Sequence, residues 1–366
     1  MNIECIKEKL SYALSKAEKI TGKNITLPIL SCVLLEANNS TLTIKATNLD
    51  LGIEINIPVK VIKPGMVAVS GSVLNNFISN ISNDKNIILE EVGGNIKVST
   101  KHSQSLIKAF PTDDFPSIPK VSKENQFKMN VGDLTKGFKS VAYSASVSTI
   151  RPTLSSIMMY PEEETVIFVA TDSFRLAEKK VKVKKHKDFG QILIPFKNVS
   201  EIIRVFEDIK DEVDVVLNKN QIALEYDGIY LTSRVIDGTF PDYKQIIPKE
   251  IKTEVVLLKQ DLVSALKISN IFSDKFSQVV FTISPKEKIF KIATKNMDVG
   301  ENISNLDAVL KGDDITVSFN YKYIIDCFQS IDSDSISLNF SDMNRPMVVT
   351  GVGDKSFTYL VMPMNK

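Results

Sequence analysis

Two hydrophobic spacings alternate along the chain and predict its secondary structure. In six segments, apolar residues recur three and four positions apart, which is typical of amphipathic helices with one buried face. We expect these helices at residues 5–20, 73–81, 133–145, 196–207, 260–270 and 323–328. Elsewhere apolar and polar residues alternate with a period of two, which predicts strands. Gly93-Gly94 and Asp227-Gly228 mark hairpin turns between such strands.

One strand with its following turn occurs three times. Residues 166–177 read V-I-F-V-A-T-D-S-F-R-L-A, an alternating strand that ends in a polar turn. Val166, Phe168 and Ala170 are expected to share one face of this strand. Residues 42–54 and 289–301 have related sequences. Their Ala-Thr pairs begin at Ala46, Ala170 and Ala293, so that they are 124 and 123 residues apart.

Other landmarks follow the same period. Phe115-Pro116 recurs as Phe240-Pro241, 125 residues later. The first helix of each copy begins near Ile6, Leu134 and Leu262. A period of this length is the size of a whole domain, whereas solenoid repeats are about 20–50 residues long. We therefore expect three tandem copies of one α+β domain, at residues 1–120, 127–246 and 247–366.

The composition is that of a soluble globular protein. The chain is 43% hydrophobic and 24% charged. It contains no apolar run of about 18 residues that could span a membrane, and it begins without the pattern of a signal peptide. Its three unclustered cysteines indicate neither a disulfide framework nor a zinc site. We therefore predict a cytoplasmic protein that does not contact membranes.

The net charge excludes bulk attraction to nucleic acid. There are 45 basic and 44 acidic side chains, so any nucleic-acid surface has to gather its positive charge locally. Helix 5–20 carries Lys9 and Lys16 on a flank of its apolar stripe, and helix 133–145 carries Lys136 and Lys139 opposite its own stripe. Either these lysines are ordinary solvated faces, or they form one basic surface shared by the copies.

The residue types that catalysis requires are scarce. The two histidines, His102 and His186, show no metal-ligand spacing, and we predict no metal and no cofactor. Ser173 lies in a polar turn with Thr171 and Asp172, but no general base accompanies it. The similar turn in the first copy indicates a structural role for Thr171 and Asp172. A hydrolase that acts through Ser173 is therefore disfavoured.

The C-terminal segment is unusually apolar. Before it, G-V-G at 351–353 lies between two strand-like runs, which predicts a tight hairpin rather than a phosphate-binding loop. The chain then ends with Y-L-V-M-P-M at 359–364. We expect so apolar a tail to be docked on the protein or to form part of a binding site.

Five motifs give the chain its resemblance to a known family. They are L-P-I-L at 27–30, R-P-T-L at 151–154, A-T-D-S-F-R-L-A at 170–177, D-G-T-F-P-D-Y at 237–243 and Y-L-V-M-P-M at 359–364. With them the whole chain resembles the bacterial DNA sliding clamps, the beta subunits of DNA polymerase III. The resemblance implies three clamp domains, each with paired helices packed on antiparallel sheets. It further implies a head-to-tail homodimer that closes into a ring with the helices lining the hole.

The resemblance also implies a non-catalytic processivity factor that encircles duplex DNA without regard to sequence. The alternative is a triplicated peptide-binding scaffold that does not encircle DNA. The positions assigned to the DNA-facing surface are Lys9, Lys16, Lys23, Asn24, Lys136, Lys139 and Lys197. Because a ring retains DNA by enclosing it, a modest basic lining suffices, and this agrees with the low net charge.

A second implied site is a pocket between the second and third domains that binds short apolar peptides. The matching positions are Leu154, Thr171, Ser173, Phe174, Arg175, Leu176, Pro241, Ile246, Pro346, Leu360, Met362, Pro363 and Met364. The implied partners are the alpha subunit of DNA polymerase III, the delta subunit of the clamp loader and other clamp-motif proteins of replication and repair. Phe174 replaces the histidine of well-known relatives and Asn365-Lys366 replaces their ending, so a different peptide preference is expected.

The contacts of the implied ring come from the first and third copies. The first copy contributes strand 106–109 and helix 73–81, with Phe77, Leu106 and Ile107. The third copy contributes Ile271 and Phe272, two large apolar residues after the end of a helix. A two-fold ring built in this way has two equal interfaces.

Overall fold

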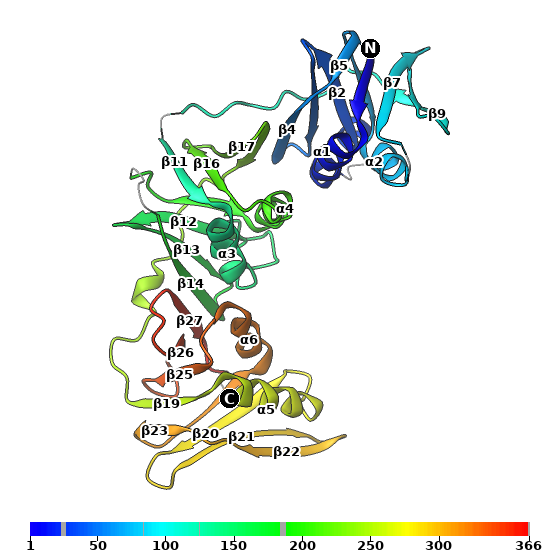
Figure 1. Ribbon diagram of the computed structural model, residues 1–366. Helices are drawn as coiled ribbons and strands as arrows, with labels where there is room; N and C mark the ends of the chain where they lie inside the picture. Colours follow the sequence, from blue (N-terminus) through cyan, green and yellow to red (C-terminus); the bar gives the residue numbers. More distant parts are fainter. Residues whose placement is uncertain (23–26, 83, 124, 184–187, 365–366) are drawn as a thin grey trace. The chain divides into compact units, whose positions relative to one another are not determined.

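The computed structural model describes residues 1–22, 27–82, 84–123, 125–183 and 188–364. Within these ranges antiparallel sheets carry a small number of helices, which confirms the α+β class. Contacts divide the chain into two compact units. Unit 1 consists mainly of Met1–Thr135 and Lys197–Val235, and unit 2 mainly of Lys136–Lys184 and Ile236–Lys366. Figure 1 shows the elements of both units. The limits of the three copies stay a prediction.

Unit 1 is built on two antiparallel sheets. In order across the smaller sheet, the strands are β5 (Lys60–Lys63), β1 (Asn2–Ile6), β7 (Asn86–Val92), β8 (Asn95–Ser99) and β9 (Gln104–Ile107). In order across the larger sheet, they are β10 (Ala109–Phe110), β6 (Gly65–Ser70), β2 (Cys32–Asn38), β3 (Thr41–Thr47), β4 (Leu51–Pro58), β18 (Ile229–Arg234), β17 (Gln221–Tyr226), β16 (Glu212–Leu217) and β11 (Asn125–Asn130). Helix α1 (Lys7–Ile20) packs against β3, β4 and helix α2 (Gly71–Ser79). Helix α4 (Phe196–Phe206) and the 3-10 turn Pro28–Ser31 complete the unit.

Unit 2 repeats this plan. In order across its larger sheet, the strands are β15 (Ile192–Pro195), β12 (Ser156–Glu162), β13 (Thr165–Thr171), β14 (Arg175–Lys182), β27 (Phe357–Val361), β26 (Met347–Gly351), β25 (Ser335–Phe340), β19 (Thr253–Leu258) and β23 (Val309–Gly312). The smaller sheet contains β22 (Gly300–Asn305), β21 (Ile289–Asn296), β20 (Gln278–Ser284) and β24 (Ile315–Asn320). Its helices are most of α3 (Val131–Ala142), then α5 (Lys259–Ile271) and α6 (Tyr321–Asp326), with 3-10 turns at Tyr243–Gln245 and Cys327–Ser330.

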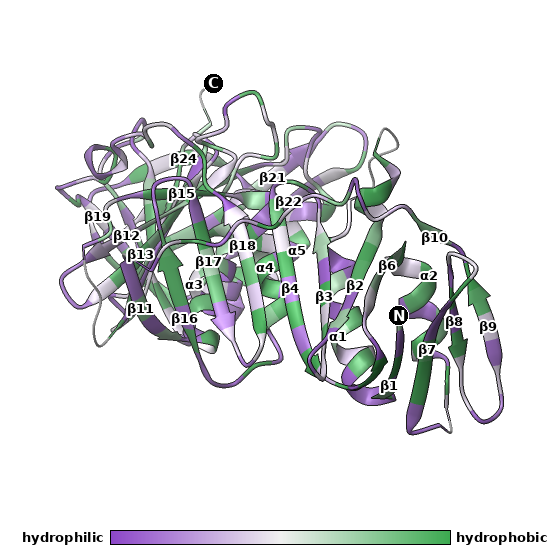
Figure 2. Cartoon of the chain, turned by 90° about the horizontal axis from the view of Figure 1, so that it is seen from above, coloured by the Kyte–Doolittle hydropathy of each residue, from purple (hydrophilic) through white to green (hydrophobic). Residues whose placement is uncertain are grey.

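Each nine-stranded sheet joins strands from two successive copies of the repeat. In unit 1, β4 of the first copy pairs with β18 of the second, and Gly52 lies opposite Thr232. In unit 2, β14 of the second copy pairs with β27 of the third, and Leu176 lies opposite Leu360. Figure 2 shows β2, β3, β4 and β18 side by side, with hydrophobic residues along their length. The two junctions are therefore formed by corresponding strands.

Apolar stripes on the helices cover the sheets much as the sequence predicts. On α1, Leu10, Ala13, Leu14 and Ala17 are fully buried. Ile6 lies within the helix predicted at 5–20 but is exposed, because residues Asn2–Ile6 form β1 and pair with β7 instead of starting the helix. The predicted hairpin turns at 93–94 and 227–228 are confirmed, since each lies between two paired strands. At 351–353 a hairpin is present but is longer than predicted, because Gly351 is the last residue of β26 and the connection to β27 runs from 352 to 356.

The strand of the repeated motif, β13, differs from the prediction, because both of its faces are buried rather than one. One face packs under α3, where the rings of Phe168 and Phe138 meet edge to face with centroids 5.1 Å apart. Ile167 and Val169 on the other face belong to a separate apolar cluster. Gly137 allows α3 to approach, since a Cβ there would lie 2.6 Å from Cε2 of Phe168. A strand with two covered faces gives no clear alternation in sequence.

Candidate functional site

The turn between β13 and β14 is fixed by its own side chains. Thr171 Oγ1 donates to the carbonyl of Arg175 at 2.7 Å and accepts from the backbone N–H of Ser173 at 3.1 Å. Asp172 Oδ1 accepts from the N–H groups of Phe174 and Arg175 at 2.9 and 3.0 Å. Ser173 has a φ of +79°, which these bonds hold in the left-handed region. The predicted structural role of Thr171 and Asp172 is therefore confirmed.

Arg175 is held by its own chain. Its Nε donates to Asp172 at 3.0 Å and one terminal nitrogen donates to Asp326 of α6. The guanidinium carbon lies 4.8 Å from the centre of the Tyr323 ring. Because two carboxylates already use this cation, Arg175 acts as a link between the turn and α6. Sequence spacing gave no sign of Tyr323 and Asp326, whose short helical pattern is equally typical of a core helix.

The apolar C-terminal tail is docked beside this turn, as the sequence predicts. Leu176 pairs with Leu360 across β14 and β27. Beyond the strand, the N–H of Met362 donates to the carbonyl of Phe174 at 2.8 Å, and that of Met364 to Ser318 at 2.8 Å. The motif at 170–177 and the chain's last apolar residues therefore share one sheet and one surface.

The thirteen residues expected at the peptide site divide into a floor and a surface. The buried floor consists of Leu154, Thr171, Leu176, Pro346 and Leu360. The exposed or half-buried surface consists of Ser173, Phe174, Arg175, Pro241, Ile246, Met362, Pro363 and Met364. Phe174 is 59% exposed, and its ring stacks on that of Tyr323 with centroids 6.1 Å apart. The apolar side chains of this second group, together with Tyr323, are called the apolar surface below.

The D-G-T-F-P-D-Y segment is anchored from beneath. Tyr243 donates to the buried carboxylate of Glu178, and the hydroxyls of Tyr243 and Tyr160 lie 2.7 Å apart. Burial and the bond to Glu178 raise the pKa of Tyr243 far above its ordinary value, so its phenol stays protonated. Lys244 pairs with Glu162 at 2.7 Å. These bonds fix the segment that carries Pro241 and Ile246.

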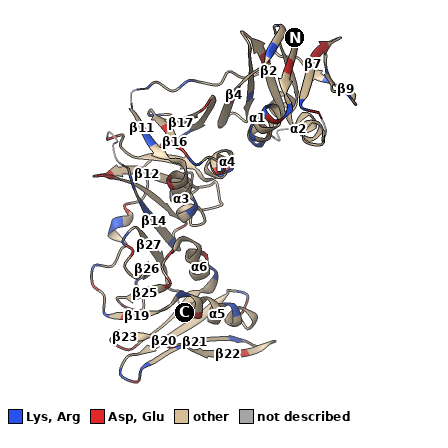
Figure 3. Ribbon diagram, in the orientation of Figure 1, with Lys and Arg blue, Asp and Glu red and all other residues tan. Residues whose placement is uncertain are grey.

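The positions expected to face DNA fall into three groups: four exposed lysines, one buried lysine, and two residues outside the described ranges. Lys9, Lys136, Lys139 and Lys197 are exposed on α1, α3 and α4. Figure 3 shows the charged residues along these helices. The Lys136 ammonium pairs with Asp332 at 2.5 Å. Lys23 and Asn24 lie outside the described residues.

The prediction that Lys16 faces DNA is wrong. It is 2% exposed, and its ammonium donates to the carbonyl of Val205 and pairs with Asp208 at 2.6 Å. Both partners lie at the end of α4, about 190 residues away in the chain. A side chain enclosed in this way is not available to a DNA phosphate.

The residues expected at the ring contact differ in their exposure. Leu106 on β9 is 61% exposed and Ile271 at the end of α5 is 65% exposed. Phe77 and Phe272 are half-buried. Ile107 is instead buried, because its side chain points into its own unit from β9. It is therefore removed from the predicted contact.

The described residues contain no group of three or more histidine, cysteine or acidic side chains that could hold a metal ion. Across the same ranges, no helix combines the length and the apolar character that crossing a bilayer would take.

Three copies of one α+β plan, with an apolar surface built on the repeated turn, define the class of DNA sliding clamps. The chain belongs to the family of DNA polymerase III beta subunits. The N-terminal domain model of that family matches residues 1–119, the central domain model 128–242 and the C-terminal domain model 244–365. The protein is accordingly a DNA sliding clamp, a non-catalytic member of the replication machinery.

Similar proteins match the chain over all or nearly all of its length. The beta sliding clamp of Synechocystis sp. is 27% identical over 387 residues, which cover 100% of this chain and 99% of that relative. The beta sliding clamp of Staphylococcus aureus is 24% identical, with 96% of each chain covered. Among solved structures, the DNA polymerase III subunit beta of Pseudomonas aeruginosa has a TM-score of 0.95 at 24% identity, with 100% of both chains covered. The Bacillus subtilis sliding clamp has a TM-score of 0.95 at 20% identity, covering 100% of this chain and 99% of that one.

Proposed function

We propose that two copies of the chain join head to tail in the cytoplasm and close into a ring around duplex DNA. The observation that carries the proposal is a pair of unprotected sheet edges. Strand β9 ends one sheet of unit 1, and strand β22 ends one sheet of unit 2. An edge strand presents unpaired N–H and C=O groups, so it can extend the sheet of another chain. Joining β9 of one copy to β22 of its partner, and the reverse, gives two equal contacts.

Apolar side chains support these edges as contact surfaces. Leu106 projects from β9, and Ile303 of β22 is 59% exposed. Ile271 lies at the end of α5, which packs on β22. The Phe272 ring packs beside Gly300, the first residue of β22. Large exposed apolar residues next to an open sheet edge are expected to be covered by a partner.

Retention on DNA tests the ring. Protein assembled on a nicked circular plasmid should stay bound through gel filtration in about 1 M salt, because salt weakens phosphate contacts but does not open a closed ring. Cutting the plasmid with a restriction enzyme before filtration should release it. Release from the uncut circle at the same rate would contradict encirclement and would support a scaffold that does not enclose DNA.

Within this ring, we propose that Lys9, Lys136, Lys139 and Lys197 face the DNA. All four are exposed on helices α1, α3 and α4. Because the whole chain carries a net charge of only +1, these contacts are few and allow the ring to slide. The assignment of Lys23 and Asn24 to the DNA-facing surface stays a prediction.

We further propose that the apolar surface binds short apolar peptides of the polymerase III alpha subunit, the clamp loader delta subunit and other clamp-motif proteins. Methionine side chains adapt to different ligands. Met362 lies here beside Phe174, and Met364 follows it beside Ser318. The floor of Leu176 and Leu360 is rigid, because both residues lie in paired strands. Burial of two or three apolar peptide side chains supplies the binding free energy, and ordering the peptide reduces it. The difference predicts a dissociation constant of about micromolar size.

A further inference from the structure

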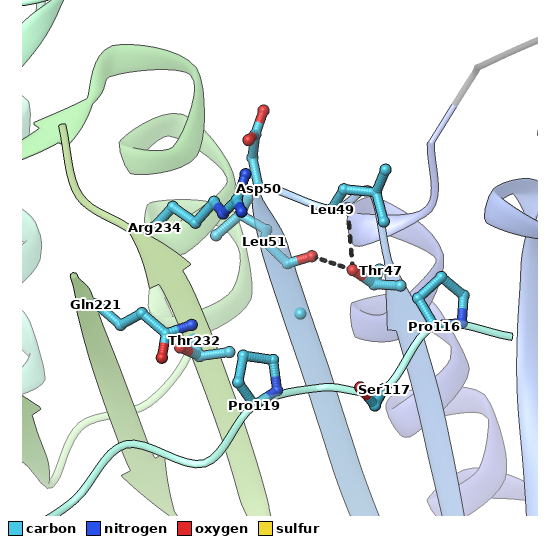
Figure 4. Close-up of a pocket in the computed structure, with 11 residues that line it drawn as sticks. Thr47, Leu49, Asp50, Leu51, Pro116, Ser117, Pro119, Gln221, Thr232 and Arg234 are labelled. Atoms are coloured by element: carbon cyan, nitrogen blue, oxygen red, sulfur yellow. Dashed lines mark hydrogen bonds between the residues drawn. The ribbon is translucent and has the colours of Figure 1, made fainter.

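A cavity of about 400 Å³ lies in unit 1, beside the pairing of β4 with β18. Its volume is near the lower end of the range of about 300–1,000 Å³ that holds small ligands. Figure 4 shows the residues that line it, which come from the turn before β4, from β17 and β18, and from the segment that contains Pro116 and Pro119. The surfaces proposed above for DNA, peptides and the ring contact do not include it.

The turn beside this cavity has the same bonds as the turn beneath the apolar surface of unit 2. Thr47 Oγ1 donates to the carbonyl four residues later at 2.7 Å, and Thr171 Oγ1 does the same at 2.7 Å. Two residues after each threonine, Leu49 and Ser173 have φ values of +78° and +79°. The same backbone frame, a turn closed by the threonine hydroxyl with a residue of positive φ, therefore occurs in both units.

The strand that follows this frame is also held in the same way. The N–H of Arg234 donates to the carbonyl of Asp50 at 2.9 Å. In unit 2, the N–H of Met362 donates to the carbonyl of Phe174 at 2.8 Å. Arg234 thus stands in the position of Met362, and Asp50 stands in the position of Phe174. By the strand pairing, Thr232 stands in the position of Leu360.

The side chains at these positions differ in chemistry. Unit 2 has three apolar residues there: Phe174, Leu360 and Met362. Unit 1 has three polar ones: Asp50, Thr232 and Arg234. The cavity therefore lies beside the same backbone frame as the apolar surface of unit 2, but its side chains offer hydrogen-bonding groups and a cation in place of apolar contacts.

Arg234 decides which ligand fits. Across the described ranges, its guanidinium has no ion pair or hydrogen-bond partner. In Figure 4 the Asp50 carboxylate points away from the space between Gln221, Thr232 and Pro119. An exposed arginine over a cavity binds a carboxylate with two parallel N–H donors. Leu49 and Pro116 form an apolar wall on the opposite side of the cavity.

We propose that this cavity is a second peptide site, which takes a short segment with a carboxylate next to an apolar residue. The carboxylate pairs with Arg234, and the apolar group packs against Leu49 and Pro116. The inference goes beyond the proposed function and rests on it in one respect, because peptide as the class of ligand comes from the corresponding surface in unit 2.

Methyl NMR of the full-length protein tests this site with three blocked dipeptides. Acetyl-Leu-Glu-amide carries a side-chain carboxylate, acetyl-Glu-Leu-amide carries it on the other side of the leucine, and acetyl-Leu-Gln-amide is the neutral control. A fourth probe, acetyl-Gln-Leu with a free C-terminus, distinguishes a chain end from an acidic side chain. We expect at least one carboxylate probe to shift the Leu49 and Leu51 methyl signals with a dissociation constant in the millimolar range. The neutral probe should bind at least about fivefold more weakly.

A pair of variants makes the test specific. Arg234→Met creates the side chain found at the equivalent position of unit 2 and should weaken the carboxylate probe by at least about fivefold. Arg204→Met removes an exposed arginine from α4 in the same unit and should change binding by less than about twofold. Unchanged signals up to about 20 mM probe, equal binding of the neutral probe, or unchanged binding to Arg234→Met would each overturn the proposal.

The apolar surface of unit 2 is followed in the same sample through the methyl signals of Leu360 and Met362. A leucine-rich apolar peptide is added in a separate titration. If that peptide leaves Leu360 and Met362 unchanged while a carboxylate probe shifts Leu49, the proposed peptide function of unit 2 fails and the cavity proposal stands. The opposite result removes the cavity site and leaves the proposed function intact.

Discussion

Lys16 and Lys19 of α1 both bind the C-terminal end of α4. Lys19 donates to the carbonyl of Arg204 at 2.9 Å, and Lys16 donates to the next carbonyl, that of Val205. The last carbonyls of a helix lack partners within the helix and carry partial negative charge. Two lysines that cap these groups from another helix therefore stabilise unit 1. Their role is structural, although in sequence they do not differ from the lysines that we propose to face DNA.

Replacing Lys16 with methionine should destabilise the protein by about 1–3 kcal/mol, because Val205 and Asp208 lose a buried donor. The free energy of unfolding in urea measures this. Lys9→Met, on the exposed side of the same helix, is the control and should change that free energy by less than about 0.5 kcal/mol. If both substitutions have the same small effect, the ammonium of Lys16 is not held as the structure shows.

The Lys16–Asp208 pair also predicts a pH dependence. Burial raises the pKa of Asp208, but the bond to Lys16 lowers it, and the net pKa is below the ordinary value. A carboxyl with a lowered folded-state pKa stabilises the fold above its unfolded pKa of about 3.9 and loses this contribution as the pH falls through the folded value. The difference in unfolding free energy between wild type and Lys16→Met should therefore be constant near neutral pH and shrink below about pH 4. A difference that grows in acid would contradict this assignment.

Phe174 is the most exposed aromatic side chain of the apolar surface. Phe174→Ala removes an apolar anchor and should weaken the binding of a clamp-motif peptide by about ten- to a hundredfold, measured by fluorescence polarisation. Val309 is similarly exposed, at 62%, but lies on the edge strand β23 of the same sheet. Val309→Ala should therefore leave the affinity unchanged. Equal losses in the two variants would indicate a general effect on the fold.

At the scale of elements, the C-terminal tail is the segment on which the apolar surface depends. Strand β27 ends at Val361, so truncation after this residue keeps the pairing with β14 intact. It removes Met362 and Met364, and with them the bonds to Phe174 and Ser318. We expect loss of peptide binding without loss of the dimer, because neither sheet edge proposed for the ring is touched. Sedimentation velocity and fluorescence polarisation on one preparation measure both properties, and loss of the dimer as well would contradict the assignment.

The elements show which parts of the structure a single sequence predicts. The repeat was recognisable because a period of about 125 residues brings corresponding strands, turns and helices into register. Local patterns do not predict strand β1, because its pairing with β7 depends on residues 80 to 88 positions away. Ile107 was misassigned for a related reason, since which way a strand residue points depends on the register with its neighbour. Local patterns thus predict the existence of an element better than its surroundings.

The candidate site follows the same rule. The motif at 170–177 and the tail are far apart in the chain, yet their apolar character and the family resemblance brought them together correctly. Arg175 is one of the positions that the family resemblance assigns to the peptide site, and in the structure it is held by Asp172 and Asp326. A charged residue in a motif does not reveal whether its partner lies in the same chain or outside it. The missing information is the position of α6, which only the folded chain supplies.

At the scale of the whole molecule, enclosure and electrostatic attraction make separate predictions for the proposed ring. Each lysine that contacts a phosphate adds about 0.9 to the slope of log affinity against log salt concentration. Four exposed lysines per chain, Lys9, Lys136, Lys139 and Lys197, give eight in a dimer (4 × 2). Replacing all four with glutamine should therefore lower the slope for binding to short linear duplexes, by at most about 7.

The same variant should remain on a closed circle as long as the wild type, because no covalent or strand-pairing contact of the ring is altered. Half-lives on nicked plasmids, followed by gel filtration, provide the comparison, and they should agree within about twofold at high salt, where phosphate contacts contribute little. Lys16→Met serves as the matched control, since it removes a buried lysine and should leave the salt slope unchanged. If the variant that lacks these four lysines leaves circles as fast as it leaves linear DNA, then charge, and not the closed ring, holds the protein on DNA.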